Sequence, residues 1–134
     1  MILLDTVVLS ELRKTRPSPL VVAWLRGCAA EDLFISAISI GEIERGICKV
    51  TDRAFAEALT RWLEDLLRLY ADRVLPITAS IARRWGQLSA RLGHDGADLL
   101  IAATALSHGL TVATRNVQHF VPAGVQVIDP FAGV

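Results

Sequence analysis

The chain opens with Met1-Ile2-Leu3-Leu4-Asp5-Thr6, a short apolar run that ends on an acid. An uninterrupted apolar run of this kind is typical of a strand buried on both faces of a parallel sheet. Asp5 then stands at the end of the strand, and open α/β sheets place their binding crevices outside the carboxyl ends of such strands. The opening therefore predicts a parallel sheet with a polar site at its edge.

Short apolar runs alternate with longer amphipathic stretches through the rest of the chain, which favours an α/β fold with a parallel central sheet flanked by helices. We expect strands at 1–4, 33–36, 74–77, 110–114 and 125–128. We expect helices at 6–14, 20–28, 39–49 with Ser39 as the cap, a long one opened by Thr51-Asp52, 79–92 and 97–108. In the long helix, helical spacing predicts a buried face made of Phe55, Leu59, Trp62, Leu66 and Tyr70. With 134 residues the chain fits a single domain, 1–134.

The composition argues against a highly basic nucleic-acid-binding protein and against a membrane-spanning protein. Fourteen basic and fourteen acidic residues cancel, so binding of nucleic acid through bulk positive charge is disfavoured, although a local basic patch is compatible with this balance. Hydrophobic residues make up 52% of the chain, yet the longest uncharged run, between Asp98 and Arg115, is interrupted by Ser107-His108-Gly109. That run is shorter than the ~20 apolar residues of a spanning helix. We expect no membrane segment.

The N-terminus and the cysteines both favour a cytoplasmic location. No basic region precedes the first apolar run and Asp5 interrupts it, so a signal peptide is not expected. Cys28 and Cys48 lack metal-site spacing and are too few for a disulfide framework, which favours free thiols in a reducing compartment.

Four polar residues stand at the edges of apolar elements and are the candidate site: Asp5, Glu42, Asp98 and Asn116. Three of them also have a structural interpretation. Ser39-Ile40-Gly41-Glu42 matches a capping box, in which Glu42 would return a hydrogen bond to the helix start. Asp98 lies in a first helical turn, where the helix dipole favours a carboxylate. Asn116 is a common turn or N-cap residue.

Parallel strands joined by right-handed crossovers would bring Asp5, Asp98 and Thr114-Arg115-Asn116 to one edge of the sheet. Two carboxylates 4 Å apart repel by about 1 kcal/mol in water and by about 4 kcal/mol at an effective dielectric constant of 20. A hard divalent cation would remove that repulsion, and Mg²⁺ or Mn²⁺ suits oxygen ligands. Metal-assisted hydrolysis is thus the leading hypothesis. The scattered His94, His108 and His119 do not indicate zinc, and we expect them on the surface or at caps.

Four segments resemble the PIN-domain ribonucleases, and most closely the VapC and FitB branch of bacterial toxin–antitoxin systems. The segments are 1–6, 35–46, 98–105 and 111–116, and the resemblance continues to Val127-Ile128-Asp129-Pro130. It implies a Mg²⁺- or Mn²⁺-dependent endoribonuclease toxin that hydrolyses phosphodiester bonds of RNA, often tRNA or rRNA. It further implies a cognate antitoxin that neutralises the toxin, a homodimer, and contact with DNA only through the antitoxin.

By position, Asp5, Glu42 and Asp98 match the family's three acids, and Asn116 matches its fourth acidic or amide position. The resemblance implies that Asp5 and Asp98 are the main metal ligands. Glu42 would bind the metal through water or orient the attacking water, and Asn116 would complete the pocket through a water.

Three further residues stand beside these four. Thr6 and Thr114 match supporting hydroxyls of the family, although each is also an ordinary residue at the end of a strand. Arg115 is a candidate for contacting a phosphate.

Two features depart from the family pattern. Val7 stands where the family usually has Asn or Ser, and its side chain forms no hydrogen bond. Losing such a supporting contact typically costs ~10–100-fold in metal affinity or activity, so the alternative function is a weakened interaction module that acts through its antitoxin and DNA. The second departure is the short segment Gly93-His94-Asp95-Gly96, in which Asp95 is either a substitute ligand or a turn residue. No glycine-rich nucleotide-binding motif is present.

Overall fold

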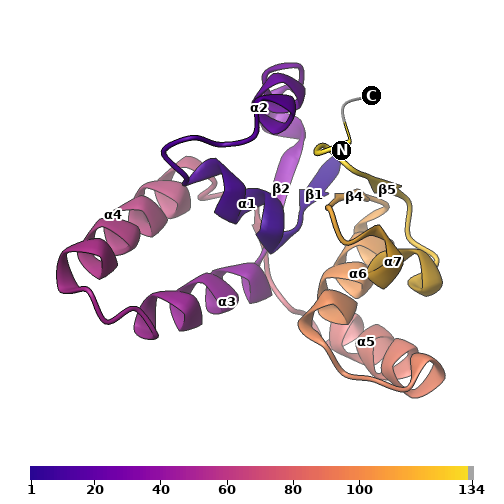
Figure 1. Cartoon of the computed structure of the whole chain (residues 1–134). Coiled ribbons are helices and arrows are strands. Elements are labelled where there is room, and N and C mark those ends of the chain that lie inside the picture. The colour runs from indigo at the N-terminus through magenta and orange to yellow at the C-terminus, as the bar shows by residue number, and fades with distance from the viewer. Residues whose placement is uncertain (133–134) are drawn as a thin grey trace.

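β1 (Ile2–Leu4) is the central strand of a five-stranded sheet in the computed structural model, which describes residues 1–132 (Figure 1). The other strands are β2 (Leu33–Ser36), β3 (Val74–Leu75), β4 (Thr111–Ala113) and β5 (Val127–Ile128). The order is β3-β2-β1-β4-β5 and every pair is parallel. The chain leaves β1 toward β2 on one side and returns to its other side at β4, so the carboxyl ends of β1 and β4 form a topological switch point.

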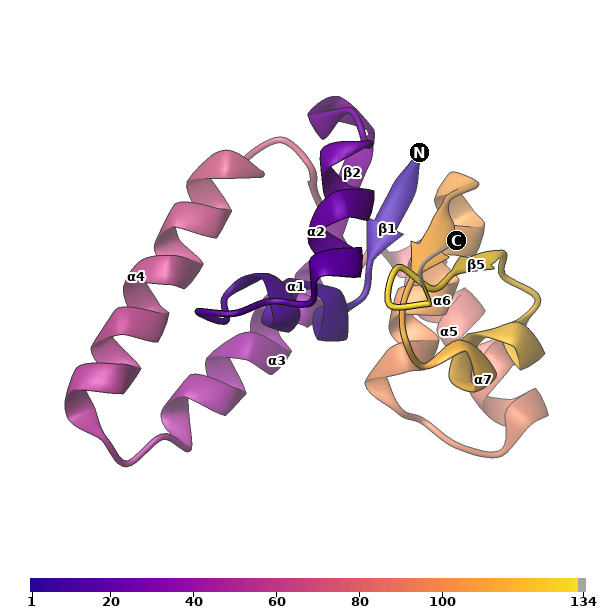
Figure 2. The same ribbon diagram turned by 45° about the horizontal axis from the view of Figure 1, so that its top comes forward.

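Two layers of helices cover the sheet, and Figure 2 shows one layer on each side of the strands. The first layer contains α1 (Thr6–Leu12), α2 (Pro19–Arg26), α3 (Ala37–Cys48) and α4 (Arg53–Leu69). The second contains α5 (Ala79–Leu92), α6 (Ala97–His108) and the short α7 (Val117–Phe120). Two 3₁₀ turns, η1 (Ala30–Asp32) and η2 (Val121–Ala123), precede β2 and β5.

The sheet separates two hydrophobic clusters because successive strand residues point to opposite faces. Leu3 and Val112 belong to the cluster that includes α5 and α6, whereas Leu4 and Ala113 belong to the cluster with α1 to α4. All four side chains are fully buried. The strand ends are therefore fixed from both sides, which holds the residues that follow β1 and β4 in place.

α6 is the most deeply buried helix of the second layer. Its apolar residues from Leu99 to Ala105 pack between the sheet and α5, and small side chains let the helix approach closely. Its apolar character is that of a core helix. None of the helices in residues 1–132 combines the length and apolar composition needed to cross a membrane.

Most expected elements are present, and the strand at 33–36 and the helices at 79–92 and 97–108 are confirmed to the residue. Asp52 caps α4, and its carboxylate accepts the Phe55 N–H at 3.1 Å. The strand expected at 74–77 ends at Leu75, and α7 was not expected.

The capping box at Ser39 is wrong. α3 begins at Ala37, because Ser36 leaves β2 with extended backbone and its hydroxyl accepts the Ile38 N–H at 3.2 Å. Ser39 lies fully buried in the first turn of α3.

The buried face expected for α4 is only partly confirmed. Leu66 and Tyr70 are buried against the sheet side, but Phe55 is 45% exposed. The first turns of α4 extend beyond the sheet beside α3 (Figure 1), and there the Arg13 guanidinium lies 5.7 Å from the centre of the Phe55 ring. Helical spacing finds the apolar stripe but does not show where the sheet beneath it ends.

Candidate functional site

The four candidate residues line one cavity of about 340 Å³ at the carboxyl ends of β1 and β4. The complete lining is Asp5, Thr6, Val7, Glu42, Ala97, Asp98, Ile101, Asn116, His119 and Phe120. A larger cavity, of about 680 Å³, lies between α2 and the segment after β5, but its lining is mostly apolar and contains one ionisable residue, Asp129. The chemistry therefore concentrates in the smaller cavity.

Asp5 is the most buried acid of the cavity, with 6% of its surface exposed. It caps α1, and its Oδ1 accepts the Thr6 N–H at 2.8 Å while its Oδ2 accepts the Thr114 hydroxyl at 2.7 Å. Burial raises the pKa of Asp5; the two hydrogen bonds oppose the rise, and the charges of Glu42 and Asp98 add to it. The three carboxylates are thus close enough to influence one another.

Glu42 reaches the cavity from α3 and is held by Thr6. The Thr6 hydroxyl donates to Glu42 Oε1 at 2.6 Å and lies 2.8 Å from the Ser39 hydroxyl. Because a hydroxyl carries one proton and a carboxylate only accepts, Ser39 then donates to Thr6. This chain of hydroxyls connects α1 to α3 and leaves Glu42 Oε2 available.

Asp98 reaches the cavity from the first turn of α6. Its Oδ1 accepts the Leu99 N–H at 3.1 Å, while its Oδ2 lies 3.7 Å from Nδ1 of His119. The backbone at Gly96 passes so close that a Cβ added there would lie 2.6 Å from Asp98 Oδ1. Glycine at this position therefore leaves room for the carboxylate.

Asn116 occupies the N-cap position of α7, but its side chain makes no capping hydrogen bond. Its N–H instead donates to the Thr114 hydroxyl at 2.9 Å, so that Thr114 contacts both Asp5 and the loop after β4. The side chain of Asn116 faces the cavity. Asn116 thus occupies the N-cap position that its residue type favours, and it also lines the cavity.

His119 was expected on the surface or at a cap, and its side chain is about half exposed, but the structure also places it in the wall of the cavity. The short helix α7 turns the chain back after β4, so that His119 lies one turn beyond Asn116 on the same side. In the sequence, the spacing of three residues between Asn116 and His119 is the signal that would have indicated His119 as a cavity residue.

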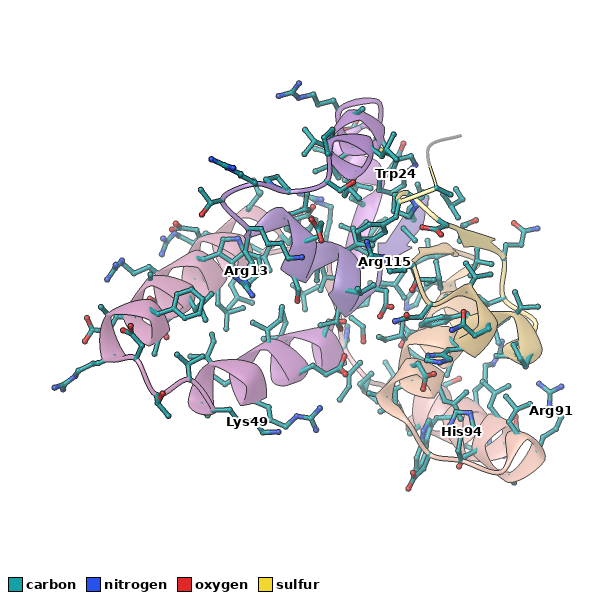
Figure 3. All side chains as sticks on the ribbon, in the orientation of Figure 1. Arg13, Trp24, Lys49, Arg91, His94 and Arg115 are labelled. Carbon is teal, nitrogen blue, oxygen red and sulfur yellow. The ribbon has the colours of Figure 1, made fainter. Side chains whose placement is uncertain are left out.

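The remaining candidates lie outside the chemical centre or form its apolar part. Val7 lines the cavity together with Ile101 and Phe120. Asp95 is exposed and is not part of the lining, so it does not substitute for a ligand in this arrangement. Arg115 stacks over the Phe131 ring at 3.8 Å (Figure 3) and does not line the cavity. Its phosphate contact stays a prediction.

The donor set fits a hard cation that keeps part of its water shell better than one held by three or more of these side chains. In the described part of the chain, no three His, Cys, Asp or Glu side chains lie close enough to hold one ion directly. Mg²⁺, however, keeps several of its waters and binds through one or two carboxylates. A water occupies about 30 Å³, so a cavity of about 340 Å³ holds an ion with its waters.

A parallel sheet with order β3-β2-β1-β4-β5 and acids at the carboxyl ends of its central strands defines one class of α/β protein. The family described as PIN domain matches residues 2–121, and the chain belongs to this family.

Within the family the chain is of the VapC and FitB type. It is 39% identical to "Toxin FitB" of Neisseria gonorrhoeae, over 98% of this chain and 99% of that protein. It is 37% identical to "VapC ribonuclease Y4jK" of Sinorhizobium fredii, over 98% of both chains. The solved structure of FitAB bound to the IR36 DNA fragment superposes with a TM-score of 0.87 at 37% identity, over 98% of this chain and 96% of that one. The resemblance found in the sequence and the expected fold class are both confirmed.

Proposed function

We propose that the chain is the toxin of a bacterial toxin–antitoxin pair and acts as a Mg²⁺- or Mn²⁺-dependent endoribonuclease. The observation that carries the proposal is the convergence of Asp5, Glu42, Asp98 and Asn116 on one cavity at the topological switch point. Two relatives that match almost the whole chain are named a toxin and a ribonuclease, which supports the same activity.

Each site residue has a role that follows from its surroundings. Asp5 and Asp98 would hold the cation, Asp5 through a carboxylate fixed by two hydrogen bonds and Asp98 through Oδ2, the oxygen that faces His119. When bound, the cation supplies charge for the phosphate oxygens and lowers the pKa of a water. Glu42, whose Oε1 is held by Thr6, takes the proton of the attacking water at Oε2. The water then forms the new bond to phosphorus as the bond to a ribose oxygen breaks.

The partners follow from the same family relationship. An antitoxin that covers the acidic cavity would silence the enzyme, and contact with DNA would occur through that antitoxin, in line with the structure of FitAB bound to the IR36 DNA fragment. The RNA substrates proposed are tRNA or rRNA, in the cytoplasm. A homodimer stays a prediction.

A second function is favoured by one observation. Val7 places a side chain without hydrogen-bonding groups in the cavity wall, beside Ile101 and Phe120. A protein disabled in this way would keep the fold and act only as an interaction module through its antitoxin and DNA. It predicts weak metal binding and no cleavage.

Cleavage of a panel of tRNA and rRNA fragments with added Mn²⁺ or Mg²⁺ distinguishes these functions. The native chain is compared with Asp5→Ala, with Val7→Asn and with Asp95→Ala, the last a matched control because Asp95 is an exposed acid outside the cavity. For the nuclease we expect metal-dependent cutting that falls at least ~100-fold in Asp5→Ala, more than the loss of a supporting contact costs, and stays unchanged in Asp95→Ala.

The outcomes separate cleanly. Cutting only by Val7→Asn would identify a disabled enzyme. Full activity in Asp5→Ala would show that the proposed pocket is wrong. Silence from every variant, together with weak metal binding, would favour the interaction module.

A further inference from the structure

The position of His119 adds a nitrogen ligand to a cavity in which the other side-chain atoms able to bind a metal are oxygens. We propose that His119 binds the cation together with Asp98 and makes the site prefer Mn²⁺ over Mg²⁺. This inference rests on the proposed metal-dependent function and specifies which ion serves it.

The distance between the two side chains supports a shared ion. Nδ1 of His119 lies 3.7 Å from Oδ2 of Asp98, which is too long for an N–H···O hydrogen bond. Bonds of about 2.0–2.2 Å from one metal ion place two neighbouring ligands roughly 3–4 Å apart. The gap therefore fits an ion between the two donors without a change in either backbone.

Both donors have the freedom that a ligand needs. Oδ1 of Asp98 is occupied by the Leu99 N–H, and Oδ2 faces the imidazole. The backbone of His119 is fixed, because its N–H donates to the Asn116 carbonyl at 2.9 Å, while its side chain is 52% exposed. Within residues 1–132 the imidazole has no hydrogen bond to another side chain, and Asp98 is the one carboxylate within 4.0 Å of it.

The chemistry of the donors sets the expected preference. Mg²⁺ suits oxygen ligands and holds its waters tightly, whereas imidazole nitrogen suits transition metals. A site of carboxylates, one amide and one imidazole therefore favours Mn²⁺ over Mg²⁺ more than an all-oxygen site does. Removing the imidazole should lower the affinity for Mn²⁺ and leave that for Mg²⁺ nearly unchanged.

His94 provides a matched control. It lies near Asp98 in a neighbouring depression that also includes His119, but it does not line the 340 Å³ cavity. Its Nδ1 already accepts the Gly96 N–H at 3.4 Å. Figure 3 shows it on the segment between α5 and α6. Replacing His94 removes a nearby imidazole without removing the proposed ligand.

The test measures metal binding directly and needs no RNA. The metal-free native chain and the variants His119→Gln, His94→Gln and Asp5→Ala are titrated with Mn²⁺ and, by competition, with Mg²⁺, at one fixed pH. Free Mn²⁺ is followed by its electron paramagnetic resonance signal, and pulsed measurements on the bound ion detect ¹⁴N coupling from a coordinated imidazole. Circular dichroism establishes that each variant is folded.

We expect ¹⁴N coupling in the native chain and in His94→Gln, and its loss in His119→Gln together with a decrease of about 10-fold in the ratio of Mn²⁺ to Mg²⁺ affinity, within the range that changes around a metal site cause. Binding of Mn²⁺ that depends on Asp5 but shows no ¹⁴N coupling would overturn the role of His119 and leave the metal site standing. Coupling that survives in His119→Gln, or disappears in His94→Gln, would overturn it as well. Binding that does not depend on Asp5 would overturn both this inference and the proposed site.

Discussion

The two walls of the cavity are built differently. One wall, which we call the tethered wall, presents Asp5, Thr6 and Glu42 to the cavity and includes Ser39 and Thr114, which hydrogen-bond to them from behind. Its members are linked to one another by hydrogen bonds of 2.6–2.8 Å, and Ser39 and Thr114 are fully buried. The other, which we call the open wall, consists of Asp98, Asn116 and His119, and the side chains of Asp98 and His119 are 23% and 52% exposed.

The difference shows how one cavity combines fixed and adjustable donors. Hydrogen bonds hold the carboxylates of the tethered wall in place before an ion arrives, at the cost of burying Asp5 as a charge, which raises its pKa. In the open wall the donors are restricted only by backbone hydrogen bonds and by the hydrogen bond from the Leu99 N–H to Asp98. Their side chains can therefore move toward an ion. Substitutions in the tethered wall should therefore affect folding and activity together, and those in the open wall mainly ion binding.

Thr114→Val is expected to have the largest combined effect on folding stability and on cleavage. This change removes the donor to Asp5 Oδ2 and the acceptor of the Asn116 N–H while it keeps the shape of the side chain. We expect the free energy of unfolding to fall by about 1–3 kcal/mol, because buried polar groups lose their partners, and cleavage to fall ~10–100-fold. Urea denaturation and the cleavage assay measure the two effects.

The control for this change is Thr104→Val. Thr104 is also fully buried, but its hydroxyl only donates to the Leu100 carbonyl within α6. Cleavage should be unchanged in Thr104→Val. If both valine variants lost activity equally, the hydrogen bond to Asp5 would have no special role.

The tethered wall could be predicted from the sequence only in part. Asp5, Glu42, Asp98 and Asn116 were expected at one edge of the sheet and the structure places them there, because parallel strands and the apolar runs before them determine that edge. The link from Thr6 to Glu42 was not foreseen. It spans 36 positions and depends on how α1 packs against α3, which no local pattern encodes.

The open wall was harder to predict. α7 has only four residues, too few for helical periodicity to be recognised, and without it His119 has no reason to face the cavity. Ser39 was mistaken for a cap because Ser36 offers the same chemistry three residues earlier, and only the end of β2 decides between the two. The strand order, too, depends on packing between distant segments.

A smaller effect on stability, measured in the absence of metal, should follow from Asp5→Asn. The pKa of Asp5 is raised in the folded chain, so its contribution to stability is present at low pH and is lost as pH rises through that pKa. The variant should therefore melt higher than the native chain near neutral pH, and the difference should shrink in acid. We expect a few °C, since 1 kcal/mol shifts the Tm of a domain of this size by roughly 2–8 °C.

Glu11 supplies the opposite case. Its hydrogen bonds from Lys14 and from the Ser18 N–H lower its pKa, so its contribution is present near neutral pH and is lost as pH falls through the folded pKa. Glu11→Gln should therefore melt lower than the native chain near neutral pH. If Asp5→Asn and Glu11→Gln changed the Tm equally and in the same direction, the raised pKa assigned to Asp5 in the tethered wall would be contradicted.

The smallest effect is expected from Gly96→Ala in the open wall. The new Cβ would lie 2.6 Å from Oδ1 of Asp98, so the carboxylate would have to shift and its hydrogen bond from the Leu99 N–H would weaken. We expect Mn²⁺ affinity to fall a few-fold while the free energy of unfolding changes by less than about 1 kcal/mol, because alanine is a poorer N-cap than glycine but restricts the unfolded chain. Isothermal titration and urea denaturation measure these changes.

Gly86→Ala is the control for that substitution. Gly86 lies within α5 and a Cβ there would meet open space, so alanine should raise stability by about 0.5–1 kcal/mol and leave ion binding unchanged. A loss of affinity in Gly86→Ala equal to that in Gly96→Ala would show that the effect does not pass through Asp98.

The short exposed segment between α5 and α6 divides the site between two stretches of the chain. A cut within Gly93–Gly96 would leave Asp5 and Glu42 on one fragment and Asp98 and Asn116 on the other. The pairing of β1 with β4 and the packing of α6 against α3 and α5 would then have to bring them together. Nuclease activity from such a pair would then act as a reporter that switches on only when two halves of a split protein reassemble.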